Sequence, residues 1–211
     1  MKKFLLLLLF LVCGVLAVAQ KINLDKQVNF NYKRMFVLDS LNVKEPDFKN
    51  IDVELRIYYT CWMEEPYNSK LIQIVKTKEN EWSAKSYKYY YYNQDFFCFK
   101  NAIIEPLILG KTWAKSWDEI IKNNYLNLLS EKDIKKNNDL FIVISDGKDY
   151  TIEILTNKRK RRITYNNPQI KLETYKEAEI IISEYKMFCD FLSLLNEELN
   201  FEEFGEYSNK N

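Results

Sequence analysis

Apolar and polar positions alternate between residues 51 and 59, which is the period of a strand with one buried face. Two further apolar runs, at residues 71–75 and 82–92, flank a polar turn at residues 78–81. The turn is short enough to join antiparallel neighbours, and the second run is rich in the aromatic residues that strands favour. The pattern therefore predicts one strand followed by an antiparallel hairpin.

A second group of strands is predicted later in the chain. Residues 140–145 and 150–155 flank Asp146-Gly147, a dipeptide that favours tight hairpin turns because both residues tolerate positive φ. Residues 161–165 form another run, which is followed by two asparagines and a proline. These segments predict three more strands.

Two stretches have apolar residues at every third or fourth position, which is the spacing of a helix with one buried face. Each begins with a hydroxyl residue followed three positions later by glutamate, the capping box that starts many helices. The two capping boxes are Ser116 with Glu119, and Thr174 with Glu177. We therefore predict helices over residues 117–129 and 175–199.

These elements together predict an α+β fold, in which an antiparallel sheet of five or six strands has the two helices packed on one face. No repeat or linker-like stretch divides the chain, so we expect residues 20–211 to form a single domain with a frayed tail after residue 200. Residues 20–50 fit either a strand or a short helix before Pro46, and the sequence leaves both open.

Residues 1–19 have the three parts of a secretory signal peptide: two lysines, an apolar run over residues 4–16, and a small-x-small cleavage site at residues 17–19. The run is too short for a comfortable membrane span, which takes about 20 residues. An uncleaved membrane anchor is one alternative. A lipid-attachment site at Cys13 is another, but the residue before Cys13 is not small. We therefore expect a periplasmic or secreted protein with no membrane span in the mature chain.

Composition excludes several classes of function. The chain has no histidine, which removes Ser-His-Asp and Cys-His catalysis and histidine-ligated zinc. Its four glycines do not form a phosphate-binding pattern. The net charge of +1 becomes −1 when the two leader lysines are removed, so no global field attracts nucleic acid. We therefore expect no metal, no cofactor and no nucleic acid partner.

Three cysteines remain after the leader, and an export compartment favours a disulfide between two of them. Cys61 and Cys98 both lie at the ends of aromatic, strand-like segments, so we expect these two to pair. Cys189 falls on the apolar face of the last helix, where a free thiol behaves as a small apolar group. An intermolecular bridge is the alternative that an odd count allows.

The best candidate for a binding surface is the run of tyrosines in the second strand of the first hairpin. Tyr89 and Tyr91 should share one face of this strand, and Tyr90 and Tyr92 should lie on the other. If one face is core, the other presents flat rings that suit a sugar, a peptide or a protein partner. Cross-strand packing of these rings is the competing interpretation.

The densest charge feature of the chain is a run of five cations: Lys158, Arg159, Lys160, Arg161 and Arg162. Such a run suits an anionic polymer or an acidic partner. The competing interpretation is a solvated hairpin end, where cations protect an exposed sheet edge from pairing.

Acidic residues gather at two places. Asp146, Asp149 and Glu153 surround the predicted hairpin turn, and Glu64 and Glu65 precede a proline. The first group suggests a cation site or a carboxylate pair, but the calcium-loop pattern is missing and the turn explains the Asp-Gly dipeptide. The second group suggests the paired carboxylates of glycoside hydrolysis, but a loop before the proline explains it without chemistry.

Several short motifs occur in a fixed order along the chain. They are residues 54–58, 71–74, 82–84, 117–121, 146–147 with 150–154, and 162–168. In this order, and over residues 51–199, the chain resembles a class of small exported bacterial proteins of unknown function. The resemblance implies export and this order of segments, and it implies no activity, ligand or catalytic residue.

The sequence therefore predicts an exported, non-catalytic module that binds a protein or an anionic envelope polymer through the tyrosine strand or the basic run. Two alternatives stay open. One is a carboxylate-dependent hydrolase that uses residues such as Glu64 or Asp149. The other is a structural or inhibitor-like module whose exposed sheet edge accepts a strand from a partner.

Overall fold

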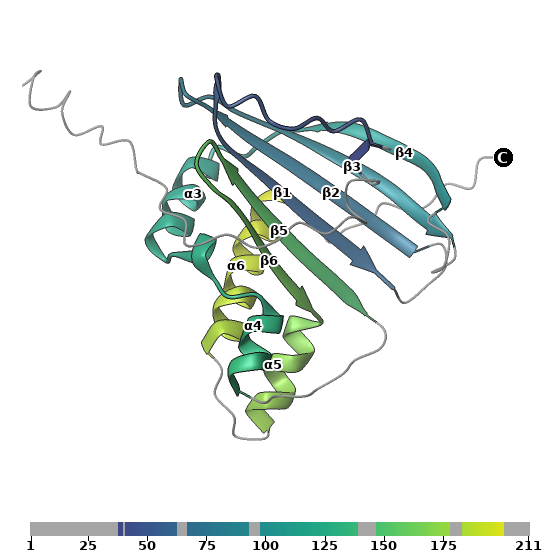
Figure 1. Ribbon diagram of the computed structural model, residues 1–211, viewed down its shortest axis with the longest axis vertical. Helices are drawn as coiled ribbons and strands as arrows, with labels where there is room; N and C mark the ends of the chain where they lie inside the picture. The colour runs from purple at the N-terminus through teal and green to yellow at the C-terminus, as the bar shows by residue number, and fades with distance from the viewer. Residues whose placement is uncertain are drawn as a thin grey trace, which may run out of the picture.

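Six strands form one antiparallel sheet in the order β4-β3-β2-β1-β5-β6 (Figure 1). The computed structural model describes residues 38–39, 41–62, 67–92, 98–138, 147–177 and 183–200. The strands are β1 Ile51–Cys61, β2 Tyr67–Thr77, β3 Trp82–Tyr92, β4 Cys98–Leu107, β5 Lys148–Thr156 and β6 Lys160–Asn166. The first four strands form a meander, and the chain then returns to place β5 on the free side of β1. Strands β4 and β6 are therefore the two edges of the sheet.

Helices occupy the connections around this sheet. They are α3 Trp113–Lys122, the 3-10 helix η1 Tyr125–Asn127, α4 Glu131–Asn138, α5 Pro168–Glu177 and α6 Ser183–Leu199. The first three connect β4 to β5, and the last two follow β6. The α+β class and the antiparallel sheet predicted from the sequence are thus confirmed. None of the helices in the described part of the chain combines the length and apolarity needed to cross a membrane.

The predicted capping box at Ser116 is wrong, because the helix begins earlier. Helix α3 starts at Trp113, with Thr112 as its N-cap residue, and Ser116 lies inside the first turns. The Ser116 hydroxyl donates to Glu198 Oε1 on α6 at 2.6 Å. The Ser116 hydroxyl, which the pattern assigned to the N-cap of the helix, therefore bonds to a distant carboxylate instead. The helix also ends sooner than residue 129, because Asn124 adopts a left-handed backbone with φ 57 before η1.

The second predicted helix, residues 175–199, also differs at its start. Helix α5 begins at Pro168, a residue whose fixed φ and missing N–H suit the first turn of a helix. Thr174 therefore lies within α5, and its hydroxyl donates to the Ile170 carbonyl at 2.9 Å instead of capping an N-terminus. Helix α6 provides the remaining part, and residues 178–182 lie outside the described range.

One face of the sheet shares a large apolar cluster with the helices. Figure 1 shows α6 running behind β5 and β6. The ring of Phe188 on α6 stacks on Tyr165 of β6 with centroids 3.9 Å apart. Members of the cluster from the sheet and helices include Val53, Leu55, Ile57, Ile72, Ile74, Ile152, Ile154, Ile163, Trp117, Ile120, Phe188, Phe191 and Leu195. The alternation read from residues 51–59 is therefore the alternation of this buried face.

The opposite face of the sheet is covered by residues 41–50, which we call the strap. Leu41 and Val43 of the strap pack with Leu38 against tyrosine and leucine side chains of β1, β2 and β3, namely Tyr58, Leu71, Tyr87 and Tyr89. The strap has turns and no regular strand or helix. The central strands β1 and β5 are thus buried on both faces, and the strap-covered face is polar in part.

The expected disulfide between Cys61 and Cys98 is wrong. Cys61 ends β1 and Cys98 begins β4, and two strands lie between them. Three steps of about 4.8 Å separate these strands, whereas bridged cysteines need Cα atoms within about 7 Å. Cys61 and Cys189 carry free thiols. Cys189 lies partly buried on α6, as expected, and burial raises the pKa of its thiol to about 11.

Strand β5 has neighbours on both sides. It pairs with β1 from Lys148 to Thr156 and with β6 from Asp149 to Leu155. The predicted strand at residues 140–145 and Asp146 lie outside the described residues.

Gly147 has φ 139, and a Cβ there would lie 1.9 Å from the Asn167 side chain. The glycine is therefore required by a close approach as well as by its backbone conformation.

Candidate functional site

Four polar side chains form a row across the strap-covered face of the sheet. Gln73 of β2, Arg56 of β1, Glu153 of β5 and Arg162 of β6 are consecutive partners in the strand register. Opposite residues in an antiparallel sheet point to the same face, so these four side chains lie side by side. We call them the polar row.

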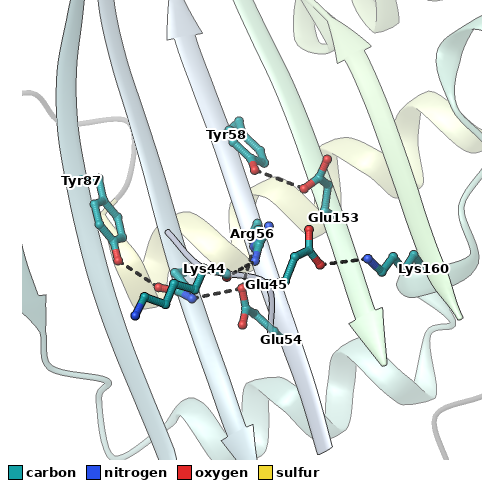
Figure 2. A network of polar contacts seen from close by, with 9 residues as sticks. Lys44, Glu45, Glu54, Arg56, Tyr58, Tyr87, Glu153 and Lys160 are labelled. Carbon is teal, nitrogen blue, oxygen red and sulfur yellow. Dashed lines mark hydrogen bonds and ion pairs between the residues drawn. The ribbon is translucent and has the colours of Figure 1, made fainter. Parts of the chain in front are cut away.

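Glu54 lies two residues before Arg56 in β1 and on the same face of the sheet. It joins the polar row through Arg56 (Figure 2). Its Oε1 accepts hydrogen bonds from Arg56 Nε at 2.6 Å and from Gln73 Nε2 at 3.0 Å. Gln73 Oε1 in turn accepts a bond from the Tyr87 hydroxyl at 2.9 Å. Arg56 and Glu54 are 0% and 1% exposed, so this pair is fully removed from water.

Glu153 forms the other half of the network. Its Oε1 accepts bonds from Arg162 Nε at 3.0 Å and Nη2 at 2.7 Å. Its Oε2 accepts a bond from the Tyr58 hydroxyl at 3.1 Å. Both oxygens of this buried carboxylate are therefore occupied by donors of the protein itself, which leaves neither available as a general base in this arrangement.

The strap is attached to this network at two points, which Figure 2 shows together. Arg56 Nη2 donates to the Lys44 carbonyl at 2.9 Å, and Lys160 Nζ bonds Glu45 Oε2 at 2.9 Å. The first contact is partly buried and the second is exposed to solvent. Arg56 Nη1 has no partner among the described residues. Arg56 of the polar row and Lys160 of β6 therefore hold the strap on the sheet.

Burial controls the electrostatics of Glu54. Desolvation raises the pKa of its carboxyl, and the charge and hydrogen bond of Arg56 offset this only in part. For Arg56, burial disfavours the charged form, but Glu54 outweighs it and the pKa of the guanidinium is raised. The arginine therefore stays charged and the ion pair is a structural one.

A second buried network lies where α4, α5 and α6 meet the end of β6. Glu131 Oε1 of α4 accepts bonds from Lys171 Nζ of α5 at 2.5 Å and from the Tyr185 hydroxyl of α6 at 3.0 Å. Lys171 is 1% exposed and also donates to Asn166 Oδ1 at 3.0 Å. The buried cation thus has two oxygen partners, as a charge in a protein interior requires.

The same segment closes the outer edge of β6. The Ser130 hydroxyl donates to the Arg162 carbonyl at 3.1 Å and accepts a bond from the Thr164 N–H at 3.2 Å. Glu131 Oε2 accepts a bond from the Asn166 N–H at 2.8 Å. Alternate backbone groups along this edge are thereby satisfied by side chains at the start of α4, so the edge is not free to pair with another strand.

The outer edge of β4 is different. From residue 102 to residue 107, no described residue forms a hydrogen bond with its outer side. Ile103 and Ile104 are 48% and 56% exposed, and Ile108 just after the strand is 90% exposed. These are three of the five exposed large apolar side chains in the described part of the chain. We call Ile103, Ile104 and Ile108 the apolar strip.

The tyrosines predicted to bind a ligand separate into two groups. Tyr89 is 2% exposed and packs under the strap, so its ring is not presented to solvent. Tyr90, Tyr91 and Tyr92 occupy the end of β3, and their side chains lie outside the described atoms. A binding role for these three stays a prediction.

The basic run is divided by the alternation of β6. Arg161 Nη2 donates to the Asn127 and Leu128 carbonyls at 2.7 and 2.8 Å, while Arg162 binds Glu153 and Lys160 binds Glu45. Lys158 and Arg159 at the hairpin turn are exposed. Of the five predicted cations, these two are therefore the ones presented to solvent without such a contact.

The predicted acidic residues show no catalytic pair within the described range. Asp149 accepts bonds from Trp62 Nε1 and Asn166 Nδ2, both at 2.8 Å. Glu64, Glu65 and Asp146 lie outside the described residues. Among the residues that can be described, no three acidic or cysteine side chains gather into a group that could hold a metal ion.

Sequence reasoning missed the Glu131–Lys171 network and the apolar strip. The partners of the network are 40 residues apart, and no local pattern links them. The strip did leave a signal, because adjacent isoleucines followed by a glutamate and a proline read as an edge strand.

Comparison with protein-family models, with curated proteins and with solved structures gave no match. The resemblance to small exported bacterial proteins therefore stays a prediction, and the function has to be argued from geometry.

Proposed function

We propose that the protein is an exported, non-catalytic binding module whose partner is another protein. The observation that carries this proposal is the apolar strip, which gathers three exposed isoleucines within six residues at one edge of the sheet. Exposed large apolar side chains that gather on a folded domain are typical of a protein contact site.

The state of the buried carboxylates supports a non-catalytic role. Glu153 and Glu131 are each held by at least two donors, and Glu54 is held by Arg56 and Gln73. A catalytic acid or base needs access to a substrate and a proton to exchange. Carboxylates enclosed by their own cations lack that access, so these networks act as supports for the strap and the helices.

A crosslinked pull-down tests this function. The processed protein, tagged at its C-terminus, is incubated with extracts of its own cell envelope and with the medium, and retained proteins are compared at low and high salt. We expect a protein partner that is retained at high salt, because contacts between apolar side chains are weakened little by screening. The experiment is repeated with Ile104→Ser, which changes the strip. Ile170→Ser, which changes an exposed isoleucine on α5, is the matched control.

Two outcomes contradict the proposal. Retention of an anionic polysaccharide that is lost on replacing Lys158 and Arg159 would assign binding to the hairpin and to a polymer. Turnover of a glycoside or ester substrate that Asp149→Asn abolishes, with no protein retained, would make the protein a hydrolase.

A further inference from the structure

The apolar strip extends around the edge of the sheet instead of lying on one face. Ile103 is opposite Lys88 in the register with β3, and Ile104 is opposite Tyr87, whose side chain packs under the strap. Neighbouring residues of a strand point to opposite faces, so the two isoleucines lie on either side of β4. An occupant must therefore lie along the edge to contact both.

The backbone of β4 limits how far a partner strand could pair with it. Pro106 has no N–H to donate, which is typical of an edge strand. The register shifts between Lys88 and Tyr90, which leaves an extra residue in β4 near Asn101. Bulges and prolines are devices that restrict strand addition at sheet edges. The pairable stretch is therefore short, and side-chain contacts must provide most of the binding.

Charges beside the strip favour an acidic neighbour. Glu105 is already bound by Lys88, with 3.3 Å between Nζ and Oε2. Lys85, opposite Pro106 in the register, is exposed and forms no ion pair with a described residue. Lys111 is exposed three residues after the strip, but acidic residues lie at the same end. The antiparallel register places the turn with Glu79 and Glu81 beyond the Leu107 end of β4, and Glu198 Oε2 accepts a bond from the Thr112 hydroxyl at 3.0 Å. Lys85 is therefore the cation that carries the charge argument.

From these observations we infer that the apolar strip docks a short extended segment of a partner protein that is apolar at its centre and carries a flanking carboxylate. The inference rests on the proposed binding function and names the chemistry of the partner. Apolar residues of the segment cover Ile103, Ile104 and Ile108, and its carboxylate approaches Lys85. A second copy of this chain fits less well, because it would bring the same lysine to the interface.

Fluorescence anisotropy with labelled peptides tests the inference on the purified, processed protein. The probes are the peptides Asp-Val-Ile-Val-Asp and Lys-Val-Ile-Val-Lys, each with neutral ends. We expect the acidic peptide to bind at least about fivefold more tightly than the basic one at low salt. Ile104→Ser should weaken its binding about tenfold, because an apolar contact is lost, whereas Ile170→Ser should change it less than about twofold. Lys85→Glu should reduce or reverse the preference between the peptides.

Several results would overturn this assignment. Equal affinity for both peptides would contradict the preference for an acidic segment. Equal effects of Ile104→Ser and Ile170→Ser on the affinity would show that the peptide does not bind at the strip. Sedimentation showing a dimer that Ile104→Ser dissociates assigns the strip to a second copy. If no peptide binds while the pull-down still retains a protein, the inference fails and the proposed function stands; if both experiments are empty, the proposed function fails as well. Unchanged thermal melting of each variant confirms that it is folded.

Discussion

The two edges of the sheet are treated in opposite ways. At β6, the side chains of Ser130 and Glu131 bond to the outward backbone groups of Arg162, Thr164 and Asn166. At β4, the outer side of residues 102–107 has no such bond from a described residue, and isoleucines are exposed there. One edge is thus closed by polar atoms of the chain, whereas the other is restricted only by a proline and a register shift.

The difference separates stability from recognition. The groups that close β6 belong to a buried network, so removing one of them leaves polar or charged atoms without partners in the interior, which is costly. The groups at β4 are exposed, so changing them should have little effect on folding. Binding surface can therefore be altered at β4 without loss of the fold, and the β6 edge should act as a structural element.

The largest effect is expected from Glu131→Gln, which leaves the Lys171 ammonium buried without its anion. Removing one partner of a buried ion pair costs about 3 kcal/mol or more. We therefore expect the free energy of unfolding, measured with urea at neutral pH, to fall by about this amount. The double variant Glu131→Gln with Lys171→Met should recover part of the loss, since no buried charge remains. A loss below about 1 kcal/mol for the single variant would contradict the structural role of this edge.

Alkaline pH should destabilise the protein at the same β6 edge. Burial, with the nearby charge of Glu131, raises the pKa of the Tyr165 and Tyr185 hydroxyls well above the ordinary value of 10.0. The folded state thus holds these protons more tightly than the unfolded state, so their stabilising contribution is complete below the unfolded pKa and declines as the pH rises above it. At about pH 11 the preferential ionisation of the two hydroxyls in the unfolded state should lower the free energy of unfolding by about 3 kcal/mol.

Urea unfolding at increasing pH provides this measurement, with Tyr185→Phe as the control. The variant has one hydroxyl fewer to ionise, so its stability should decline less steeply. Equal slopes would mean that Tyr185 titrates normally and that the α4–β6 junction is open to water.

The sequence predicted the strands whose faces alternate, but it did not predict β4. Strand β1 was predicted from its period-2 pattern, and β2, β3, β5 and β6 were predicted from apolar or aromatic runs bounded by turns. In β4 neither face is regularly apolar, because this strand is at the edge and its isoleucines are adjacent. Pro106 argues only against a central strand and is compatible with an edge strand. Edge strands carry a weaker pattern because less of each face is buried.

Interactions between distant residues explain the other differences. Arg161 and Arg162 were read as one charged run, yet alternation sends Arg162 to Glu153 and Arg161 to loop carbonyls. The Arg162–Glu153 pair joins two strands that are neighbours in the sequence. The closure of β6 by Ser130 could not be predicted, because it depends on where α4 docks. Capping patterns failed for a related reason, since Ser116 found a carboxylate on α6.

A smaller effect is expected from Ser130→Ala. The variant leaves the Thr164 N–H and the Arg162 carbonyl without their partner at the closed edge. Losing such a hydroxyl should lower the unfolding free energy by about 1 to 2 kcal/mol. Native-state hydrogen exchange should also become faster at the Thr164 amide than at the amides of β6 that pair with β5. Unchanged exchange at Thr164 would show that another group protects this edge.

The smallest effect is expected at the open edge, where Glu105→Gln makes the same chemical change as Glu131→Gln. Glu105 and Lys88 are 51% and 24% exposed, so their ion pair lies in contact with water. Exposed pairs contribute between 0 and about 1 kcal/mol, and we expect a change below about 0.5 kcal/mol in urea unfolding. The two substitutions make the same chemical change, but one is made in the exposed ion pair of the β4 edge and the other in the buried ion pair of the β6 edge. If Glu105→Gln destabilised the protein as much as Glu131→Gln, β4 would also have to be a closed, structural edge, and the strip could not be a surface left free for a partner.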